Sequence, residues 1–468
     1  MSFDGINIPQ KLVPGNYLQL GLAAQRQTQR NFKELLEKRK LPENGWKEEE
    51  IEALVHQLAA LDSNNFGHNV GLGEREARIA CKLVARRHYN FGHGIGRSGD
   101  LLESQPKAAG STLMANLTNA LLLDLIQTIG MRTCRGCFLV PMATGMTLTL
   151  CLLALHKQRP KAKYVLWSRI DQKSCFKAIT AAGLQPVIIN NLVLTEEQSL
   201  VTDSDRFLQH INKLGPDNIL CLYTTTSCFA PRNSDDIVEI AKLAKLMALP
   251  HLVNNAYGLQ CNSITTQLDR AQRVGRIDYI VQSTDKNLLV PVGGAIVASR
   301  DEESLKHLAS SYAGRASSSQ TLDVFMTLLS LGHKGYLNLL EERRNNFQYL
   351  KLRLQQFAAM HREVVPQCQN NSISLALTLS SLSVTPGSRS VTELGAMLHT
   401  RGISGVRVVP VGQTKSIDGY EFKNFGSHRD QLNVPYLTVA ASLGVTGSEI
   451  DKFFEVLDKC WTQFTKLS

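Results

Sequence analysis

The 468-residue sequence lacks the marks of a secreted, metal-binding or repetitive protein. Its ten cysteines are scattered through apolar or helical contexts and form no disulfide framework, which indicates a reducing compartment. Cys134 and Cys137 form one C-x-x-C pair, but no second pair of cysteines or histidines completes a zinc site, so we expect no bound metal. Internal repeats and low-complexity segments are also absent from the sequence.

Long hydrophobic runs are scarce as well. One uncharged and largely apolar stretch, residues 138–155, nearly reaches the length that spans a bilayer, but Pro141 and Gly145 interrupt it. A buried strand, a turn and a buried helix fit this stretch better than a membrane helix. Asp4 precedes any apolar run, so we expect no secretory signal peptide. The sequence therefore predicts a cytoplasmic protein with no membrane partner.

Acidic residues are in the minority. The 51 Lys and Arg residues exceed the 41 Asp and Glu residues, which gives a formal net charge of +10 and indicates an anionic partner. Positive charge is concentrated in "NFKELLEKRK", residues 31–40, where we expect Lys33, Lys38, Arg39 and Lys40 on one helix. A solvated helix face is the alternative interpretation of this stretch.

The pattern of apolar residues divides the chain into three parts. Residues 1–60 show helical spacing, for example in "EEEIEALVHQLAAL", and predict a helical N-terminal extension. Within residues 61–334, strand-like and helix-like runs alternate from about 137 to 300, which predicts an α/β domain with a large, mostly parallel sheet. Residues 335–468 begin with a long helix and continue with short strands, which predicts a smaller α+β domain.

Three chemically distinctive stretches fall at predicted strand ends, where ligands bind in such sheets. "ATG", residues 143–145, enters a helix and offers N–H groups and a hydroxyl to a phosphate. Asn254 in "VNNAYG" can reach a ring nitrogen, and Lys286 in "QSTDK" can bond to an aldehyde. Phosphate, ring nitrogen and aldehyde together describe pyridoxal phosphate. A solvated loop lysine is the alternative interpretation of Lys286 taken alone.

The order of these stretches resembles the aminotransferase-like (fold-type I) pyridoxal-phosphate enzymes. More closely, "NFGHGIGRSGD", "QPKAAGS", "VPMATGMTLTL", "RIDQKSCFKA", "TTTSCFAPR", "VNNAYG" and "DKNLLVPVGGAI" resemble the family of O-phosphoseryl-tRNA(Sec):selenocysteinyl-tRNA synthases. The resemblance runs from about residue 10 to 465. It implies a pyridoxal-phosphate selenium transferase that is a homotetramer. This enzyme would convert tRNA(Sec) carrying phosphoserine to selenocysteinyl-tRNA(Sec), with selenophosphate as the selenium donor.

The resemblance also implies roles for individual residues. The cofactor would be carried by Lys286, the catalytic residue, and contacted by Ala143, Thr144, Gly145, Gln172 and Asn254. The substrate phosphate would lie near Gly96, Arg97, Ser98, Gln105, Lys107 and Arg315, with Arg75 supplied by a neighbouring subunit. The tRNA would contact Lys38, Lys40, Arg273 and Arg401. Most of the wider superfamily has an aspartate where this chain has Asn254, so we expect a weaker electron sink here.

Other interpretations remain at this stage. Gly94, Gly96 and Gly99 spell the dinucleotide motif G-x-G-x-x-G, but no strand is predicted before it and no helix directly after it, so a nicotinamide site is not expected. Another pyridoxal-phosphate enzyme, either a cysteine desulfurase or a phosphoseryl-tRNA to cysteinyl-tRNA synthase, is one rival. A desulfurase would need a mobile cysteine, for which Cys175 and Cys228 are candidates. A non-catalytic tRNA-binding scaffold is the second rival.

Overall fold

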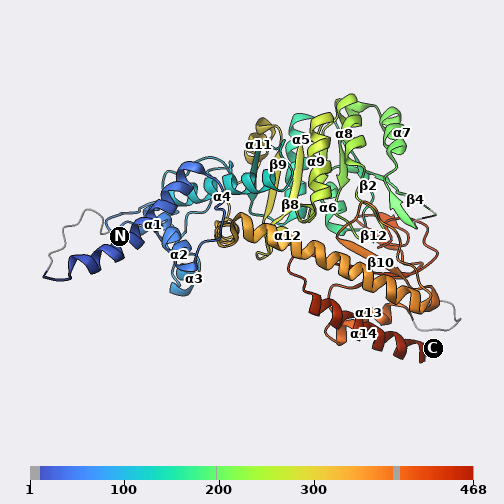
Figure 1. Ribbon diagram of the computed structural model, residues 1–468. Helices are drawn as coiled ribbons and strands as arrows, with labels where there is room; N and C mark the ends of the chain where they lie inside the picture. The colour runs from blue at the N-terminus through green and yellow to red at the C-terminus, as the bar shows by residue number, and fades with distance from the viewer. Residues whose placement is uncertain (1–10, 195, 197, 383–389, 467–468) are drawn as a thin grey trace.

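The computed structural model describes residues 11–194, 196, 198–382 and 390–466. A seven-stranded sheet lies at its centre, in the order β1-β9-β8-β7-β6-β2-β3 (Figure 1). Only β9 runs against its neighbours within this sheet, which confirms the prediction of a mostly parallel sheet. Its strands are β1 (Gly136–Val140), β2 (Tyr164–Ser168), β3 (Gln185–Ile189), β6 (Ile219–Thr225), β7 (His251–Asn254), β8 (Tyr279–Ser283) and β9 (Ala295–Ser299).

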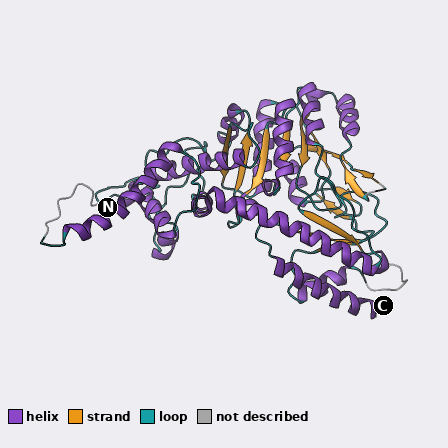
Figure 2. Ribbon diagram, viewed as in Figure 1, coloured by secondary structure: helices purple, strands orange, loops and turns teal. Residues whose placement is uncertain are grey.

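The central strands are buried on both faces, as all seven residues of β6 show. Parallel strands need helical crossovers, and those helices cover both faces of the sheet. Figure 2 shows helices on either side of the strands. The helices of this domain are α5 (Thr144–Gln158), α6 (Lys173–Ala181), α7 (Ser204–Leu214), α8 (Ile237–Leu246), α9 (Asn262–Val274), α10 (Thr284–Leu288) and α11 (Glu302–Ala309). A separate hairpin pairs β4 (Leu192–Leu194) with β5 (Ser199–Val201).

The stretch 138–155 forms the end of β1, a turn and most of α5, as the sequence predicted. Most of its apolar residues are buried because β1 and α5 lie inside the domain, although Met146 and Leu153 are exposed. Within the described part of the chain, no helix has the length and apolar content needed to cross a membrane.

The N-terminal helices extend away from the sheet (Figure 1). They are α1 (Gly15–Lys38), α2 (Glu48–Ala59), α3 (Lys82–Arg87) and α4 (Ala109–Thr128), and α4 packs on β1 and the long helix α12 (Ser319–His361). The predicted helices in the extension are confirmed, although residues 1–10 of that extension lie outside the described part.

One prediction in the extension was wrong. Arg39 and Lys40 do not lie on the helix with Lys33 and Lys38, because α1 ends at Lys38. Arg39 adopts a left-handed conformation (φ 52°) and its N–H caps the Leu35 carbonyl at 2.9 Å. A left-handed residue commonly ends a helix in this way. Lys40 therefore lies in the loop that follows.

The C-terminal part is a smaller α+β unit. Its main sheet is antiparallel, in the order β10-β14-β11, and a second pair joins β12 to β13. The elements are β10 (Ser374–Thr378), α13 (Thr392–Thr400), β11 (Arg407–Val409), β12 (Lys415–Ile417), β13 (Tyr420–Phe422), β14 (Tyr436–Ala440) and α14 (Gly447–Lys466). The boundary predicted after residue 334 falls within α12, just past a kink at Gly332 (φ 60°, ψ −175°). Residues 383–389 and 467–468 of the predicted domain lie outside the described part.

Candidate active site

Lys286 lies in α10, immediately after β8. Its amine is 3.2 Å from the Ser283 hydroxyl and 3.3 Å from the Asp285 carboxylate, and 39% of its side chain is exposed. The backbone around it is fixed, because Gln260 Nε2 donates to the Lys286 carbonyl at 2.6 Å and Asn287 Nδ2 donates to the Ser283 carbonyl at 2.7 Å. The structure therefore presents an accessible amine on a rigid turn.

Asn254 ends the neighbouring strand β7 and is buried. Its Oδ1 accepts the Ala256 N–H at 3.2 Å, which fixes the orientation of the amide. Its Nδ2 donates one hydrogen to Cys175 Sγ at 3.1 Å. The second N–H of the amide remains to donate to a ligand. Burial raises the pKa of Cys175 to about 11, so this thiol stays protonated at neutral pH.

The turn 143–145 follows β1 and begins α5. The Thr144 hydroxyl is buried and has no hydrogen-bond partner among the described residues. A β-carbon on Gly145 would lie 3.1 Å from Ser174 Cβ, so α6 approaches this turn closely. Gln172 is the N-cap residue of α6. A lone buried hydroxyl beside the free N–H groups of a helix start fits the phosphate of a cofactor.

These three groups lie at the same end of the sheet, where β1, β7 and β8 have their carboxyl ends. β1, β7 and β8 run in the same direction, so their carboxyl ends, which carry the turn 143–145, Asn254 and Lys286, face the same side. The structure thus places the residues predicted for the ring, aldehyde and phosphate of pyridoxal phosphate along one edge.

A second group of predicted residues lines one pocket of about 350 Å³. Six of the seven residues predicted for the substrate phosphate surround it, and Gly96 is not among its lining residues; the six are Arg75, Arg97, Ser98, Gln105, Lys107 and Arg315. Arg75 belongs to this pocket within a single chain, so the grouping itself needs no neighbouring subunit.

The charges in this pocket are only partly compensated. Lys107 is 2.5 Å from Glu76, and Arg97 is 3.4 Å from Glu103. Arg75 and Arg315 have no acidic partner among the described residues. Burial lowers the pKa of His93, and the positive charges of Arg315 and Lys107 lower it further, while the carboxylates of Asp62 and Glu76 oppose the shift. Glu74 also lines the pocket, but its one carboxylate is outnumbered by the four cationic side chains that line it. This excess of positive charge suits a phosphate dianion.

The glycine-rich loop beside this pocket is shaped by contacts within the chain. Ile95 exchanges two backbone hydrogen bonds with Ala316, of 2.8 and 3.0 Å. A β-carbon on Gly94 (φ 78°) would lie 2.4 Å from the Ala316 carbonyl oxygen, and one on Gly96 (φ 74°) would lie 2.4 Å from the Asp100 oxygen. The two glycines are therefore required for close backbone packing, which places Arg97 beside Arg315. No strand–turn–helix surrounds them, as expected for a chance match to the dinucleotide motif.

Helix α12 begins beside the phosphate pocket and contacts the turn that carries Lys286. Arg315 lies just before α12, and Gln320 in the first turn of α12 packs against Gly293 and Gly294, which precede β9. Farther along α12, Tyr336 Oη donates to the Asn287 carbonyl at 3.0 Å. The helix that follows Arg315 therefore supports the turn that carries Lys286.

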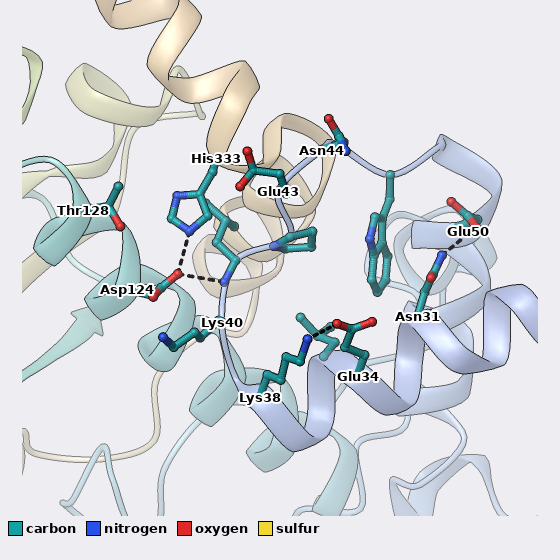
Figure 3. Close-up of a pocket in the computed structure, with 15 residues that line it drawn as sticks. Asn31, Glu34, Lys38, Lys40, Glu43, Asn44, Glu50, Asp124, Thr128 and His333 are labelled. Carbon is teal, nitrogen blue, oxygen red and sulfur yellow. Dashed lines mark hydrogen bonds and ion pairs between the residues drawn. The ribbon is translucent and has the colours of Figure 1, made fainter.

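The four residues predicted for tRNA lie elsewhere, and none lines the phosphate pocket. Lys38 and Lys40 line a pocket of about 750 Å³ between α1, α4 and α12 (Figure 3). Arg273 is in the last turn of α9, 2.7 Å from Asp269. Arg401 caps α13, where its guanidinium donates to Gln463 Oε1 at 2.6 Å.

Sequence reasoning missed several supporting residues. Gln260 and Tyr336 hold the turn of Lys286 from far away in the sequence, and no local pattern marks them. Glu76 pairs with Lys107 across 31 positions, which spacing alone cannot predict. Asn287 directly follows Lys286, and its amide at a strand-to-helix turn was a signal that could have found it.

Comparisons with known proteins agree with this geometry. The family model described as O-phosphoseryl-tRNA(Sec) selenium transferase, SepSecS, matches residues 61–462. A protein of that name from Dictyostelium discoideum is 43% identical and covers 99% of this chain and 100% of its own length. The protein of that name from Methanopyrus kandleri is 32% identical over 96% of this chain and 98% of its own length.

Solved structures show the same likeness. The crystal structure of an archaeal O-phosphoseryl-tRNA(Sec) selenium transferase matches with a TM-score of 0.88 and 30% identity, over 97% of this chain and 99% of that one. An Oryza sativa TDC with PLP and tryptamine matches with a TM-score of 0.59 at 14% identity, over 89% of this chain and 95% of that one, which shows a shared fold alone. The full-length match in both sequence and fold means that this chain belongs to the O-phosphoseryl-tRNA(Sec) selenium transferase family.

Proposed function

We propose that this enzyme converts tRNA(Sec) carrying phosphoserine to selenocysteinyl-tRNA(Sec), with selenophosphate as the selenium donor. Its family membership supports the reaction class. The observation that carries the proposal is the grouping of Arg75, Arg97 and Arg315 in one positively charged pocket. Arg315 directly precedes α12, the helix whose Tyr336 supports the turn of Lys286. A phosphate-binding pocket and a reactive lysine in one enzyme suit a substrate whose phosphate must leave.

The residues at the sheet edge fit pyridoxal phosphate. Lys286 would hold its aldehyde carbon, Asn254 its ring nitrogen, and the turn 143–145 its phosphate, with Gln172 over the ring. The buried, unpartnered Thr144 hydroxyl supports this assignment, because such a group is costly unless a ligand satisfies it. When bound, the cofactor supplies an electron sink that lets a proton leave the substrate α-carbon and a phosphate leave the β-carbon.

Lys286 is the proposed base. With the cofactor bound, the Lys286 Nζ would take the proton from the substrate α-carbon. The Asp285 carboxylate and the Ser283 hydroxyl lie within about 3.3 Å of the amine and would accept hydrogen bonds from it before the proton transfer. The fixed backbone of the turn keeps the amine within reach of a single carbon atom.

The phosphate pocket would orient the leaving group. Arginine forks bind phosphate oxygens through paired hydrogen bonds, and Arg75 and Arg315 have no acidic partner to displace within the described part of the chain. Lys107 would leave its ion pair with Glu76, and Arg97 its ion pair with Glu103, to bind the substrate phosphate. Positive charge at the departing phosphate stabilises the charge that develops as the bond to the β-carbon breaks.

Asn254 would limit side reactions. Its free N–H can donate to an unprotonated ring nitrogen, whereas a carboxylate would keep that nitrogen protonated. A neutral ring withdraws electrons less strongly. Because phosphate is a good leaving group, elimination can follow proton removal at once, and a weak sink is sufficient. Transamination and decarboxylation would then be suppressed.

The tRNA would dock on surfaces outside this site. Lys38 and Lys40 at the end of α1 would contact the backbone, Arg401 would read a base near the acceptor end, and Arg273 would add a further contact. We propose a homotetramer in which docking and catalysis involve different subunits; Arg75 lines the phosphate pocket of its own chain. A cytoplasmic location accords with the absence of disulfide bonds among the described residues.

The rival cysteine desulfurase has little support. Cys175 and Cys228 are both buried, and burial raises the pKa of each thiol to about 11. A desulfurase needs an accessible thiolate on a mobile segment. Neither cysteine offers one.

The test is product identification. The purified chain, loaded with pyridoxal phosphate, is incubated with phosphoseryl-tRNA(Sec) and selenophosphate, and the amino acid is released from the tRNA and identified by mass spectrometry. Selenocysteine is expected, and omission of selenophosphate or the change Lys286→Ala should abolish it. Recovery of unchanged phosphoserine, or cysteine formed equally well from sulfide, would refute the proposal.

A further inference from the structure

Asp124 is the only charged residue of α4, and its carboxylate lies in the wall of the pocket that Lys38 and Lys40 also line (Figure 3). One oxygen, Oδ2, accepts two hydrogen bonds. The Leu41 N–H donates to it at 3.1 Å, and His333 Nε2 donates at 2.8 Å. Both side chains are largely buried, with 16% of Asp124 and 15% of His333 exposed. Hydrogen bonds to a buried carboxylate are strong and well directed.

The Lys40 loop, residues 39–46, is inserted into the kink of α12. The His333 N–H donates to the Pro42 carbonyl at 2.8 Å, and the Trp46 N–H donates to the Leu329 carbonyl at 2.8 Å. The fit leaves no room for side chains at two glycines. A β-carbon on Gly332 would lie 2.6 Å from the Asn44 carbonyl carbon, and one on Gly45 would lie 1.9 Å from the Ser330 oxygen.

Lys40 lies between two fixed backbone positions. On one side the Arg39 N–H caps α1 through the Leu35 carbonyl, and on the other side the Leu41 N–H is held by Asp124. The Lys40 side chain is exposed and has no acidic partner in the described ranges. A pre-ordered backbone with a free ammonium loses less entropy on binding a phosphate than a mobile loop does.

We propose that Asp124 is a positioning residue for tRNA: it holds the Lys40 loop so that Lys40 meets the RNA backbone. The inference rests on the proposed function, because it takes the docking of tRNA at Lys38 and Lys40 as given. Asp124 acts through the Leu41 amide, and His333 keeps the Asp124 carboxylate in place. α12 completes the arrangement by holding the rest of the loop in its kink.

The electrostatic effect of Asp124 and its proposed positioning role predict opposite changes in tRNA affinity when the carboxylate is removed. A carboxylate repels RNA phosphates, so its removal by itself should tighten tRNA binding. If the carboxylate positions Lys40, its removal should weaken binding. Asp124→Asn separates the two, because it removes the charge and keeps an oxygen that accepts the Leu41 N–H.

The experiment measures tRNA(Sec) affinity by filter binding over a salt series, with the full-length chain. Asp124→Leu should weaken binding about tenfold and lower the salt dependence by the amount that Lys40→Ala does. Asp124→Asn should bind as tightly as the parent or more tightly. In the Asp124→Leu background, Lys40→Ala should have little further effect. Glu43→Gln is the matched control, since it removes an exposed acid from the same loop and should leave binding unchanged or tighter.

Hydrogen exchange at the Leu41 amide gives a readout that needs no tRNA, and it should accelerate in Asp124→Leu. If that variant does not fold, His333→Leu replaces it, with a smaller loss of affinity expected. Unchanged affinity in Asp124→Leu, or additive effects with Lys40→Ala, would overturn the positioning role and leave the proposed function intact. If Lys40→Ala in the parent chain left tRNA affinity unchanged, this would instead overturn tRNA docking at this loop, and the positioning role with it.

Discussion

Arg315 offers the sharpest test of the phosphate pocket. It is half-buried, lines the pocket with Arg75 and Arg97, and has no acidic partner among the described residues, so its replacement disrupts no other ion pair. Each charge-assisted hydrogen bond contributes about 1.5–3 kcal/mol, and a guanidinium fork makes two of them with a phosphate. Because the pocket is open to solvent on one side, we take the lower half of this range. Arg315→Ala should then reduce kcat/KM for phosphoseryl-tRNA roughly 10²- to 10³-fold.

Arg315→Lys keeps the charge and loses the fork, so it should recover only part of this loss and remain about tenfold below the parent enzyme. The assay is release of inorganic phosphate from phosphoseryl-tRNA, with uncharged tRNA binding measured in parallel. Binding of uncharged tRNA should not change, because that ligand lacks the phosphoserine phosphate. Arg135→Ala, an exposed arginine outside this pocket, is the control. Full activity in Arg315→Ala, or full rescue by lysine, would refute the phosphate role.

Three further predictions follow from other parts of the molecule. Lys286→Ala should lose the absorbance of protein-bound cofactor and all turnover while its thermal unfolding stays near that of the parent; a borohydride-reduced cofactor found on another lysine would contradict this. Lys38→Ala with Lys40→Ala should weaken tRNA binding at every sequence and lower its salt dependence, whereas Arg401→Ala should cost about 1–3 kcal/mol mainly in discrimination among tRNAs, as competition binding would measure. Burial lowers the pKa of His428 to about 3, so the unfolded state binds the proton first, and stability should fall by about 1.4 kcal/mol per unit as pH drops below about 6.5. Urea unfolding of His428→Asn should show a shallower fall, and an equal fall would assign the pH dependence to other groups.

Much of the fold could be predicted from the sequence because its determinants are local. Alternating apolar strands and amphipathic helices between residues 137 and 300 specify a parallel sheet through their periodicity, and a parallel sheet brings the carboxyl ends of its strands together. Asn254 and Lys286 were therefore predictable as neighbours at one edge. The quoted motifs indicated the family and, through it, the substrate, and hydrophobic periodicity alone carries neither kind of information.

Tertiary structure decided the rest. Arg97 and Arg315 meet because Ile95 pairs with Ala316, a contact between distant segments that no local pattern encodes. The end of α1 at Lys38, and so the place of Lys40 in a loop, depends on contacts of the following loop with α4 and α12. The sequence around Gly332 reads as helix on both sides, but the structure kinks there, where the Asn44–Gly45 backbone lies too close to Gly332 for a side chain. Local propensity chooses the elements, whereas the pocket and its supports depend on close packing between elements far apart in the chain.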